Sequence, residues 1–293
     1  MNGLPCFFAG NLYNKSNPLT KKGTETIMQR YEEQRELVSK LNVIDDVLFH
    51  KVVEDKEVCE EILQIILNKP DLVVVESQPQ RFLRNLEAHS VILDVLCQDS
   101  SGDYFNIEVQ KKNDDDHQKR VRFNRSNIDT AFVESGIKYE QLPDVYLIFL
   151  TKFDIFGEKH TIYHIERVIK ETGTVVENGT HEIYVNTAID DGTELAELMQ
   201  YFKKSVGVHH KFQKLSKRVQ YFKESQKGVT EMCELVEEYA KKYAEEEVKK
   251  AVSETEIKTA LNMLKNGASV ELVVKSLPSL SEQFVRELQT QLL

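Results

Sequence analysis

The sequence has few of the features that mark secreted, zinc-binding or membrane proteins. Its four cysteines are scattered, with no CxxC pair and no histidine nearby at a metal-ligand spacing, so we expect neither a disulfide framework nor a zinc site. No apolar run approaches the roughly 20 residues that a membrane-spanning helix needs. The first residues, MNGLPCFFAGNLYNKSNP, lack both a basic start and a long apolar segment. We therefore expect a cytoplasmic protein with no membrane partner.

The sequence also has fewer basic than acidic residues. The 293 residues include 38 lysines and arginines against 48 acidic residues, which gives a formal net charge of −10. Because Lys and Arg supply the affinity for phosphate, this balance argues against a protein that coats nucleic acid with its whole surface. It leaves room for a local basic patch, for which 117-HQKRVRFNR-125 is the candidate.

The spacing of apolar residues predicts a chain of mixed helices and strands. Residues 42–68 have helical spacing, as one helix or as two joined near Glu54-Asp55. Apolar runs predict strands at 71–78, in a hairpin at 90–112, and at 144–151, 160–168 and 174–186, the last with a hairpin turn at Asn178-Gly179. Further helices are expected at 114–139, 192–205, 213–226, 230–265, 269–277 and 281–293.

These elements indicate an α+β fold, a mixed sheet flanked by helices, with a helical C-terminal extension. We divide the chain into a poorly ordered arm at 1–25, a sheet domain at 26–205 and a helical region at 206–293. The last boundary follows a shift in composition, because charges of alternating sign become frequent along the predicted helices.

A carboxylate stands in an otherwise apolar predicted strand, 91-VILDVLC-97. Side chains alternate along a strand, so Asp94 is expected on the face of Ile92 and Leu96. If the hairpin turns near Ser101, Asp94 lies directly opposite Glu108. Two carboxylates so placed, with Cβ atoms roughly 4.5–5.5 Å apart, repel each other unless a proton or cation intervenes.

A divalent cation would resolve this repulsion. Mg²⁺ suits hard oxygen ligands and usually takes one or two carboxylates, so Asp94 and Glu108 would hold it, and the carbonyl of Val109 could be a further ligand. Gln110 lies on the face of Glu108 and could orient a water, while Lys112 would return to that face with a positive charge. The spacing is equally compatible with an exposed hairpin whose carboxylates face water.

The basic helix that follows could contact phosphates. Lys119 and three arginines flank Phe123, and arginine is well suited to phosphate. Arg122 and Arg125, three residues apart on one side, are the preferred contacts. A solvated helix face explains the same pattern. The acidic triplet 114–116 would cap the start of this helix.

Taken together, Asp94, the motif 107-IEVQ-110, the helix with 120-RVRFNRS-126 and the strand 145-VYLIFLTKFDIFG-157 resemble the PD-(D/E)XK nuclease family transposases, the Rpn-like recombination-promoting nucleases. The resemblance extends upstream to 45-DDVLFHKVVEDKEVCEEILQIIL-67 and, less specifically, downstream to 256–277. It covers most of the chain from about Ile44 onward.

The resemblance implies a restriction-endonuclease-like core at 26–205 and a metal-dependent DNA endonuclease that uses Mg²⁺, with Mn²⁺ possible. Asp94 and Glu108 would be metal ligands, and Gln110 would take the place of the signature lysine. Asp46 would be the additional acid from the first helix, with Asp45 as the runner-up. The alternative is a catalytically weak nuclease-fold protein that binds nucleic acid or a partner protein. A homodimer through the helical C-terminal region is also expected.

Overall fold

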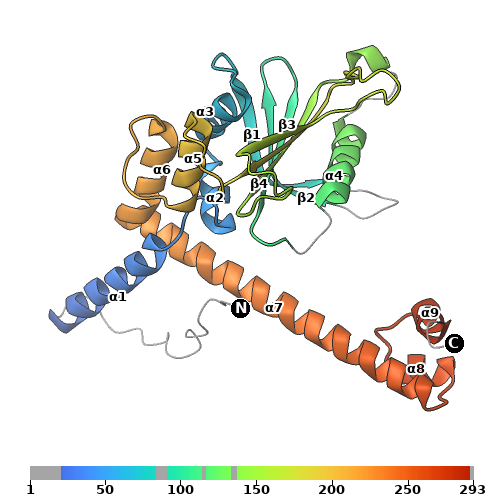
Figure 1. Ribbon diagram of the computed structural model, residues 1–293. Coiled ribbons are helices and arrows are strands. Elements are labelled where there is room, and N and C mark those ends of the chain that lie inside the picture. The colour runs from blue at the N-terminus through green and yellow to red at the C-terminus, as the bar shows by residue number, and fades with distance from the viewer. Residues whose placement is uncertain (1–20, 84–90, 114–116, 133–136, 291–293) are drawn as a thin grey trace. The chain divides into compact units, whose positions relative to one another are not determined.

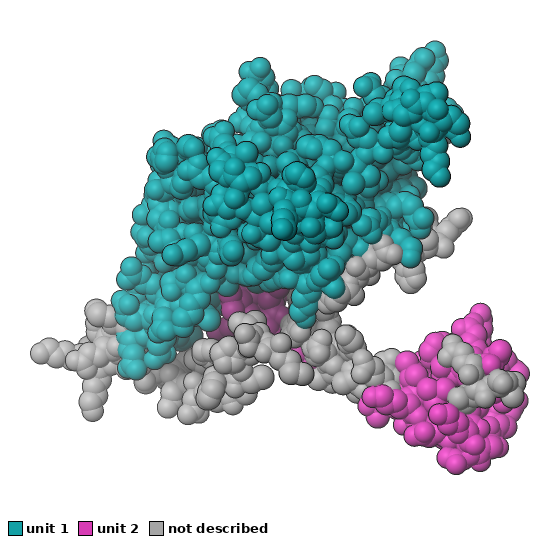
Figure 2. Space-filling model, in the orientation of Figure 1, with its two compact units in different colours: residues 1–233 teal, residues 234–293 magenta. Residues whose placement is uncertain are grey.

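The computed structural model describes residues 21–83, 91–113, 117–132 and 137–290 of the chain (Figure 1). The chain divides into two compact units, Met1–Cys233 and Glu234–Leu293 (Figure 2). Most of the predicted N-terminal arm, 1–20, lies outside the described residues. Helix α1 spans Lys21–Ser39 and so includes residues 21–25 of that arm.

The first unit is built on a six-stranded mixed sheet with the strand order β1-β2-β3-β4-β6-β5. Strands β1, β2 and β3 are antiparallel neighbours, β4 and β6 continue parallel to β3, and β5 is antiparallel to β6. This arrangement confirms the predicted α+β class. The strands are β1 (Val74–Leu83), β2 (Val91–Asp99), β3 (Tyr104–Gln110), β4 (Val145–Thr151), β5 (Ile162–Ile165) and β6 (Thr180–Asn186).

Helices cover both faces of this sheet (Figure 1). On one side lie α2 (Asp46–Val52), α3 (Lys56–Leu67), α5 (Glu194–Lys203) and α6 (Gln213–Glu224), and on the other lies α4 (His117–Phe132). The break between α2 and α3 falls where the sequence predicts it, because the Asp55 side chain caps α3 by accepting a hydrogen bond from the amide of Glu57. The predicted helix at 114–139 is shorter than expected, and its acidic triplet 114–116 lies outside the described residues. A 3₁₀ turn, η1 (Tyr139–Gln141), precedes β4.

The predicted hairpin turn at Asn178-Gly179 is wrong. In the described part of the chain, residues 174–177 take part in a single bridge, Val168 with Val175, while β6 pairs with β4 and β5. Gly179 does adopt the left-handed conformation that such turns use, with φ of 72°. Its carbonyl accepts a hydrogen bond from the amide of Val145, so the glycine leads the chain into β6 beside β4.

The boundary between the two units lies later than the shift in composition at 205/206. Helix α6 and the start of α7 (Gln226–Lys265) bury Phe222, Val229 and Met232 completely, and α6 contacts α3 in the first unit. The second unit packs the end of α7 against α8 (Val270–Ser276) and α9 (Glu282–Thr290) around Val273 and Val285. No helix in the described ranges is long and apolar enough to cross a membrane.

Candidate metal centre

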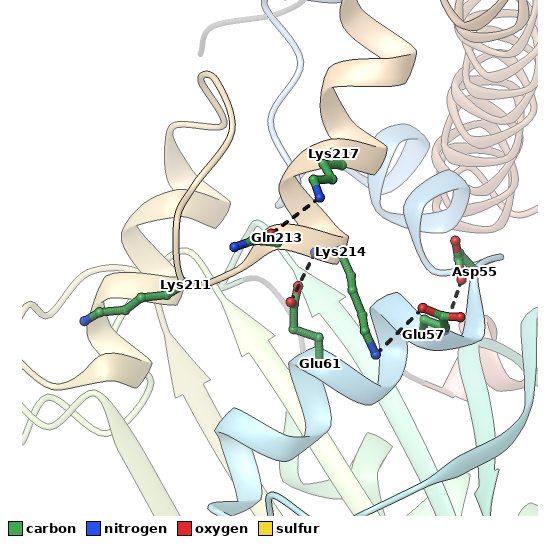
Figure 3. Close-up of a pocket in the computed structure, with 7 residues that line it drawn as sticks. All are labelled: Asp55, Glu57, Glu61, Lys211, Gln213, Lys214 and Lys217. Carbon is green, nitrogen blue, oxygen red and sulfur yellow. Dashed lines mark hydrogen bonds and ion pairs between the residues drawn. The ribbon is translucent and has the colours of Figure 1, made fainter.

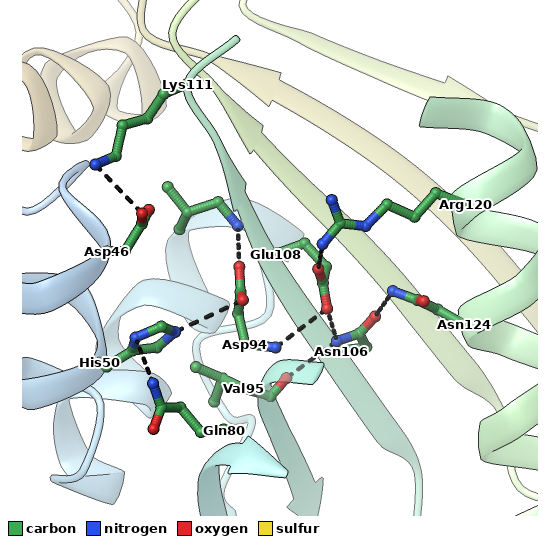
Figure 4. A network of polar contacts seen from close by, with 11 residues as sticks. Asp46, His50, Gln80, Asp94, Val95, Asn106, Glu108, Lys111, Arg120 and Asn124 are labelled. Atoms are coloured by element: carbon green, nitrogen blue, oxygen red, sulfur yellow. Dashed lines mark hydrogen bonds and ion pairs between the residues drawn. The ribbon is translucent and has the colours of Figure 1, made fainter. Parts of the chain in front are cut away.

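Asp94 and Glu108 occupy opposite positions on β2 and β3, in the predicted register. The two strands pair Val95 with Ile107 and Leu96 with Asn106, and one further step places Asp94 opposite Glu108. At this position the two strands are linked by hydrogen bonds from backbone amides to carboxylate side chains (Figure 4). The amide of Val109 donates to Asp94 Oδ2 at 2.9 Å, and the amide of Asp94 donates to Glu108 Oε1 at 3.2 Å. Each carboxylate is thus held by the other strand.

The alternation of side chains along β2 breaks at this point. Leu93 and Leu96 belong to the same core cluster, packed with Val121 and Ile128 of α4, although strict alternation would put residues three apart on opposite faces. Strict alternation therefore fails between these two leucines, and the face shared by Asp94, Ile92 and Leu96 stays a prediction.

Helix α2 supplies a residue to Asp94 that the sequence did not suggest. His50 Nε2 lies 3.6 Å from Asp94 Oδ1, and Gln80 Nε2 lies 3.4 Å from His50 Nδ1 (Figure 4). His50 follows Asp46 by four residues, one helical turn. A search for histidines one turn from an acidic helix start would have flagged it.

Glu108 is fully buried in a polar network. Its Oε1 accepts a hydrogen bond from Asn106 Nδ2 at 3.0 Å, and Arg120 Nη2 lies 3.1 Å from its Oε2. Asn106, also fully buried, accepts from Asn124 at 3.4 Å. Burial raises the pKa of Glu108 to about 8, the charge of Asp94 adds to this effect, and the Arg120 guanidinium opposes it.

Arg120 is the arginine of α4 that reaches the site, whereas the sequence favoured two others. Arg122 is exposed, and Arg125 Nε lies 3.5 Å from Asp129 on its own helix. Arg120 precedes the buried Asn124 by four residues, so both lie on the helix side that faces the sheet. The helical spacing of the buried residues of α4 is the signal that could have identified Arg120.

The residues after Glu108 are distributed differently from the prediction. Strand β3 ends at Gln110, so strand alternation does not extend to Lys112, which is exposed. Gln110 is half-buried, and its carbonyl accepts from the amide of Lys152 at 3.1 Å. Lys111 instead turns to the start of α2 (Figure 4), with its Nζ 3.3 Å from Asp46 Oδ2 and 3.7 Å from Asp45 Oδ1.

Asp45 and Asp46 have different surroundings. Asp45 accepts a hydrogen bond from the amide of Asn42 at 2.9 Å and also lies 3.2 Å from Lys152 Nζ. Asp46 is more exposed, with 44% of its side chain accessible, and is paired with Lys111. Asp46 is therefore the acid of this pair that a ligand could recruit with less disruption of the fold.

The donor set fits Mg²⁺ better than zinc. Within the described residues no group of three or more His, Cys, Asp and Glu side chains is placed to hold a metal ion, which excludes there the three or four protein ligands typical of zinc. Mg²⁺ usually takes one or two carboxylates and keeps several waters. Asp94 and Glu108 offer two carboxylates, and a cation would offset the burial that raises the pKa of Glu108.

An open hollow of about 560 Å³ lies elsewhere, between α3 and α6 (Figure 3). Several of its charged groups have partners: Lys214 Nζ lies 3.8 Å from Glu57, and the amides of Lys214 and Leu215 donate to Glu61. These contacts connect the two helices, and we assign no chemistry to the hollow. Its lining residues are Asp55, Glu57, Glu61, Lys211, Gln213, Lys214 and Lys217.

Comparison with known families gives one match. A family model described as PD-(D/E)XK nuclease family transposase matches residues 46–266. This range begins at α2, includes the whole sheet and ends after α7. The comparisons with curated proteins and with solved structures gave no match.

Proposed function

Since the chain belongs to the PD-(D/E)XK nuclease family transposases, we propose that it is a metal-dependent endonuclease that hydrolyses phosphodiester bonds of DNA in the cytoplasm. The observation that carries this proposal is the meeting of Asp94 with the fully buried Glu108, each held by the other's strand. Titratable groups with strongly shifted pKa values gather at functional sites, and Glu108 is such a group.

Asp94 and Glu108 are the residues that would hold Mg²⁺ or Mn²⁺, with the carbonyl of Val109 as a further ligand. When bound, the ion polarises the scissile phosphate and lowers the pKa of a water. The hydrogen bond from the Val109 amide fixes the Asp94 carboxylate, and that from Asn106 fixes the Glu108 carboxylate. Positioned oxygens of this kind favour the ion because little ordering remains when it binds.

Arg120 would supply the positive charge that Gln110 lacks. The lysine of the family signature would stand at position 110, two residues after Glu108 on the same strand, and this chain has a glutamine there. Arg120 approaches Glu108 from α4 instead. A guanidinium donates two parallel hydrogen bonds to a phosphate, so Arg120 would stabilise the charge that develops there, and the Gln110 amide would orient the attacking water.

Further contacts would come from residues around the carboxylates. Asp46, released by Lys111, is our candidate for an additional acid near the metal. Lys112 and Arg122 are exposed and would contact DNA phosphates away from the reacting centre. Arg125 would do so more weakly, because Asp129 competes for it.

The second candidate function is DNA or protein binding without cleavage. It is favoured by the Arg120 ion pair, which already satisfies one oxygen of Glu108, and by the net charge of −10. The two functions differ in whether the two carboxylates act on a bound phosphate.

Cleavage of supercoiled plasmid with Mg²⁺ or Mn²⁺ distinguishes them. Wild type should nick or linearise the plasmid, and Asp94→Asn or a chelator should abolish this. Asn retains an oxygen for the Val109 amide, so the fold is preserved. Asp71→Asn, at an exposed acidic position, is the matched control and should cleave as wild type does. No cleavage at all would reject the nuclease and favour the binding protein, and cleavage that survives Asp94→Asn would reject Asp94 as the metal ligand.

A further inference from the structure

Strand β5 and the residues after it have one unpaired edge. β5 pairs with β6 and is the last strand in the sheet order. Residues 167–169 then pair with 174–176, since the amide of Val176 donates to the carbonyl of Arg167 and the amide of Ile169 donates to the carbonyl of Thr174. Both pairings lie on one edge of the segment, the edge that faces β6 and the residues leading into it. In the part of the chain that the structure describes, no strand pairs with the other side of residues 162–169, and such an edge is a template for another strand.

The same segment gathers exposed apolar side chains. We define the β5 arm as residues 162–177. Single exposed apolar residues are common, but clusters of them mark interaction surfaces. Five large aliphatic side chains of this arm are 40–52% exposed: Ile165, Val168, Ile169, Val175 and Val176.

We propose that a second copy of this chain binds the β5 arm, so that the two sheets join edge to edge with antiparallel β5 strands. The two-fold axis passes through the pair formed by Ile165 and its copy. This register places His164 opposite Glu166 of the second copy, Tyr163 opposite Arg167, and Ile162 opposite Val168. Each pair is favourable: an acid with an imidazole, a cation with an aromatic ring, and two β-branched side chains.

Neighbouring registers are less favourable. A centre on Glu166 or on Arg167 would place like charges directly opposite each other, which is destabilising. A centre on His164 would place Ile162 opposite Glu166. Residues 162–168 are therefore complementary to the same residues of a second copy in one symmetric register.

The charges of the arm favour a second copy over nucleic acid. The arm has three glutamates, at 166, 171 and 177, against Arg167 and Lys170, so it does not attract phosphates. A two-fold interface brings the same surface together from both sides, and a surface with both signs of charge is compatible with that arrangement.

The oligomeric state of the full chain tests this proposal. Sedimentation velocity over a range of concentrations should show a wild-type dimer. Ile165→Glu, which places two glutamates opposite each other, and Val168→Glu should each weaken the dimer by at least about tenfold. Val206→Glu is the matched control, because Val206 is 71% exposed in the same unit. Leu272→Glu, at a position 51% exposed in α8, tests instead the dimerisation through the helical C-terminal region that the sequence predicts. Both should dimerise as wild type does.

A monomeric wild type, or a dimer weakened by Leu272→Glu and unaffected by Ile165→Glu, would overturn the proposal. The register has its own test. Glu166→Arg places Arg opposite His164 and should weaken the dimer, and adding His164→Glu should restore it by creating Glu–Arg pairs. A double variant no tighter than Glu166→Arg would overturn the register. These readouts are masses, so they do not depend on whether the protein cleaves DNA.

Discussion

Arg120 Nη2 lies 3.1 Å from Oε2 of Glu108, a carboxyl group with no exposed surface. The Arg120 side chain is itself 35% exposed, so it connects a buried acid to the solvent side of the site. Ionising a buried carboxyl is unfavourable, and the Arg120 guanidinium opposes the rise in the pKa of Glu108 without cancelling it. Arg120 therefore lowers the cost of ionising Glu108, and it places a cation where an incoming phosphate could meet it.

Replacing Arg120 should impair cleavage more than replacing any other arginine of α4. We expect Arg120→Ala to lower kcat by roughly 10²-fold, the effect typical of losing one group that stabilises developing charge. Arg120→Lys should recover part of the activity, because lysine keeps the charge but not the paired donors. The control is Arg122→Ala, which should mainly reduce the salt dependence of DNA binding. Equal losses of kcat in the two alanine variants would refute the role of Arg120.

The stability of the metal-free protein should depend on the protonation of Glu108. Burial raises its pKa to about 8 in the folded protein, whereas an unfolded glutamate has a pKa of roughly 4.3. Between these values the folded state keeps the proton and the unfolded state releases it, so the free energy of unfolding falls as pH rises and levels off above pH 8. The slope from this group is at most about 1.4 kcal/mol per pH unit.

The comparison with Glu108→Gln isolates this contribution. Glutamine mimics the protonated acid and does not titrate. Urea unfolding in the presence of a chelator, at several pH values from 5.5 to 8.5, should show the variant gaining stability relative to wild type as pH rises. A constant difference between the two proteins over this range would show that the Glu108 carboxyl is not protonated near neutral pH.

Metal binding should depend on pH in the opposite direction. A ligand carboxylate must lose its proton to bind, so Mg²⁺ or Mn²⁺ should raise the Tm of wild type more at pH 8.5 than at pH 6.5. An ion at 100 times its Kd stabilises the folded state by about 2.7 kcal/mol. Asp94→Asn should remove the shift, and Asp71→Asn should keep it. A shift of the same size in Asp94→Asn would place the ion elsewhere.

The sequence predicted those features of this site that depend on neighbouring residues along the chain. The short turn after β2 determined the register of Asp94 and Glu108, and Asp55 marked the start of α3. Arg120 and His50 were missed because their positions depend on how helices pack on the sheet. The break in alternation between Leu93 and Leu96 was missed for the same reason, because it concerns how β2 packs against α4.

Substitutions of the two acids at the start of α2 should differ in their effects: that of Asp45 on stability and that of Asp46 on cleavage. Asp45 accepts the Asn42 amide and contacts two lysines, so Asp45→Ala should cost about 1 kcal/mol of stability. Asp46→Ala loses a half-exposed pair with Lys111, and its cost should be within about 0.5 kcal/mol. If Asp46 is the additional acid near the metal, its variant should lose cleavage while remaining folded. Full activity of a stable Asp46→Ala would exclude that role.

Gly179 should be required for the entry into β6, and Gly173 provides the comparison. Both adopt nearly the same left-handed conformation, with φ of 72° and 71°, so alanine is strained at either position. A Cβ on Gly179 would lie 2.6 Å from Asp144 Oδ1, whereas one on Gly173 would meet nothing within 4 Å. Asp144 also contacts His181 in β6 at 3.0 Å, so a rotation of its carboxylate away from the added Cβ would disturb that contact. Gly179→Ala should therefore lower the free energy of unfolding by up to about 1 kcal/mol more than Gly173→Ala does, as measured by urea denaturation. Equal losses would show that the conformation of the glycine, and not its approach to Asp144, limits this position.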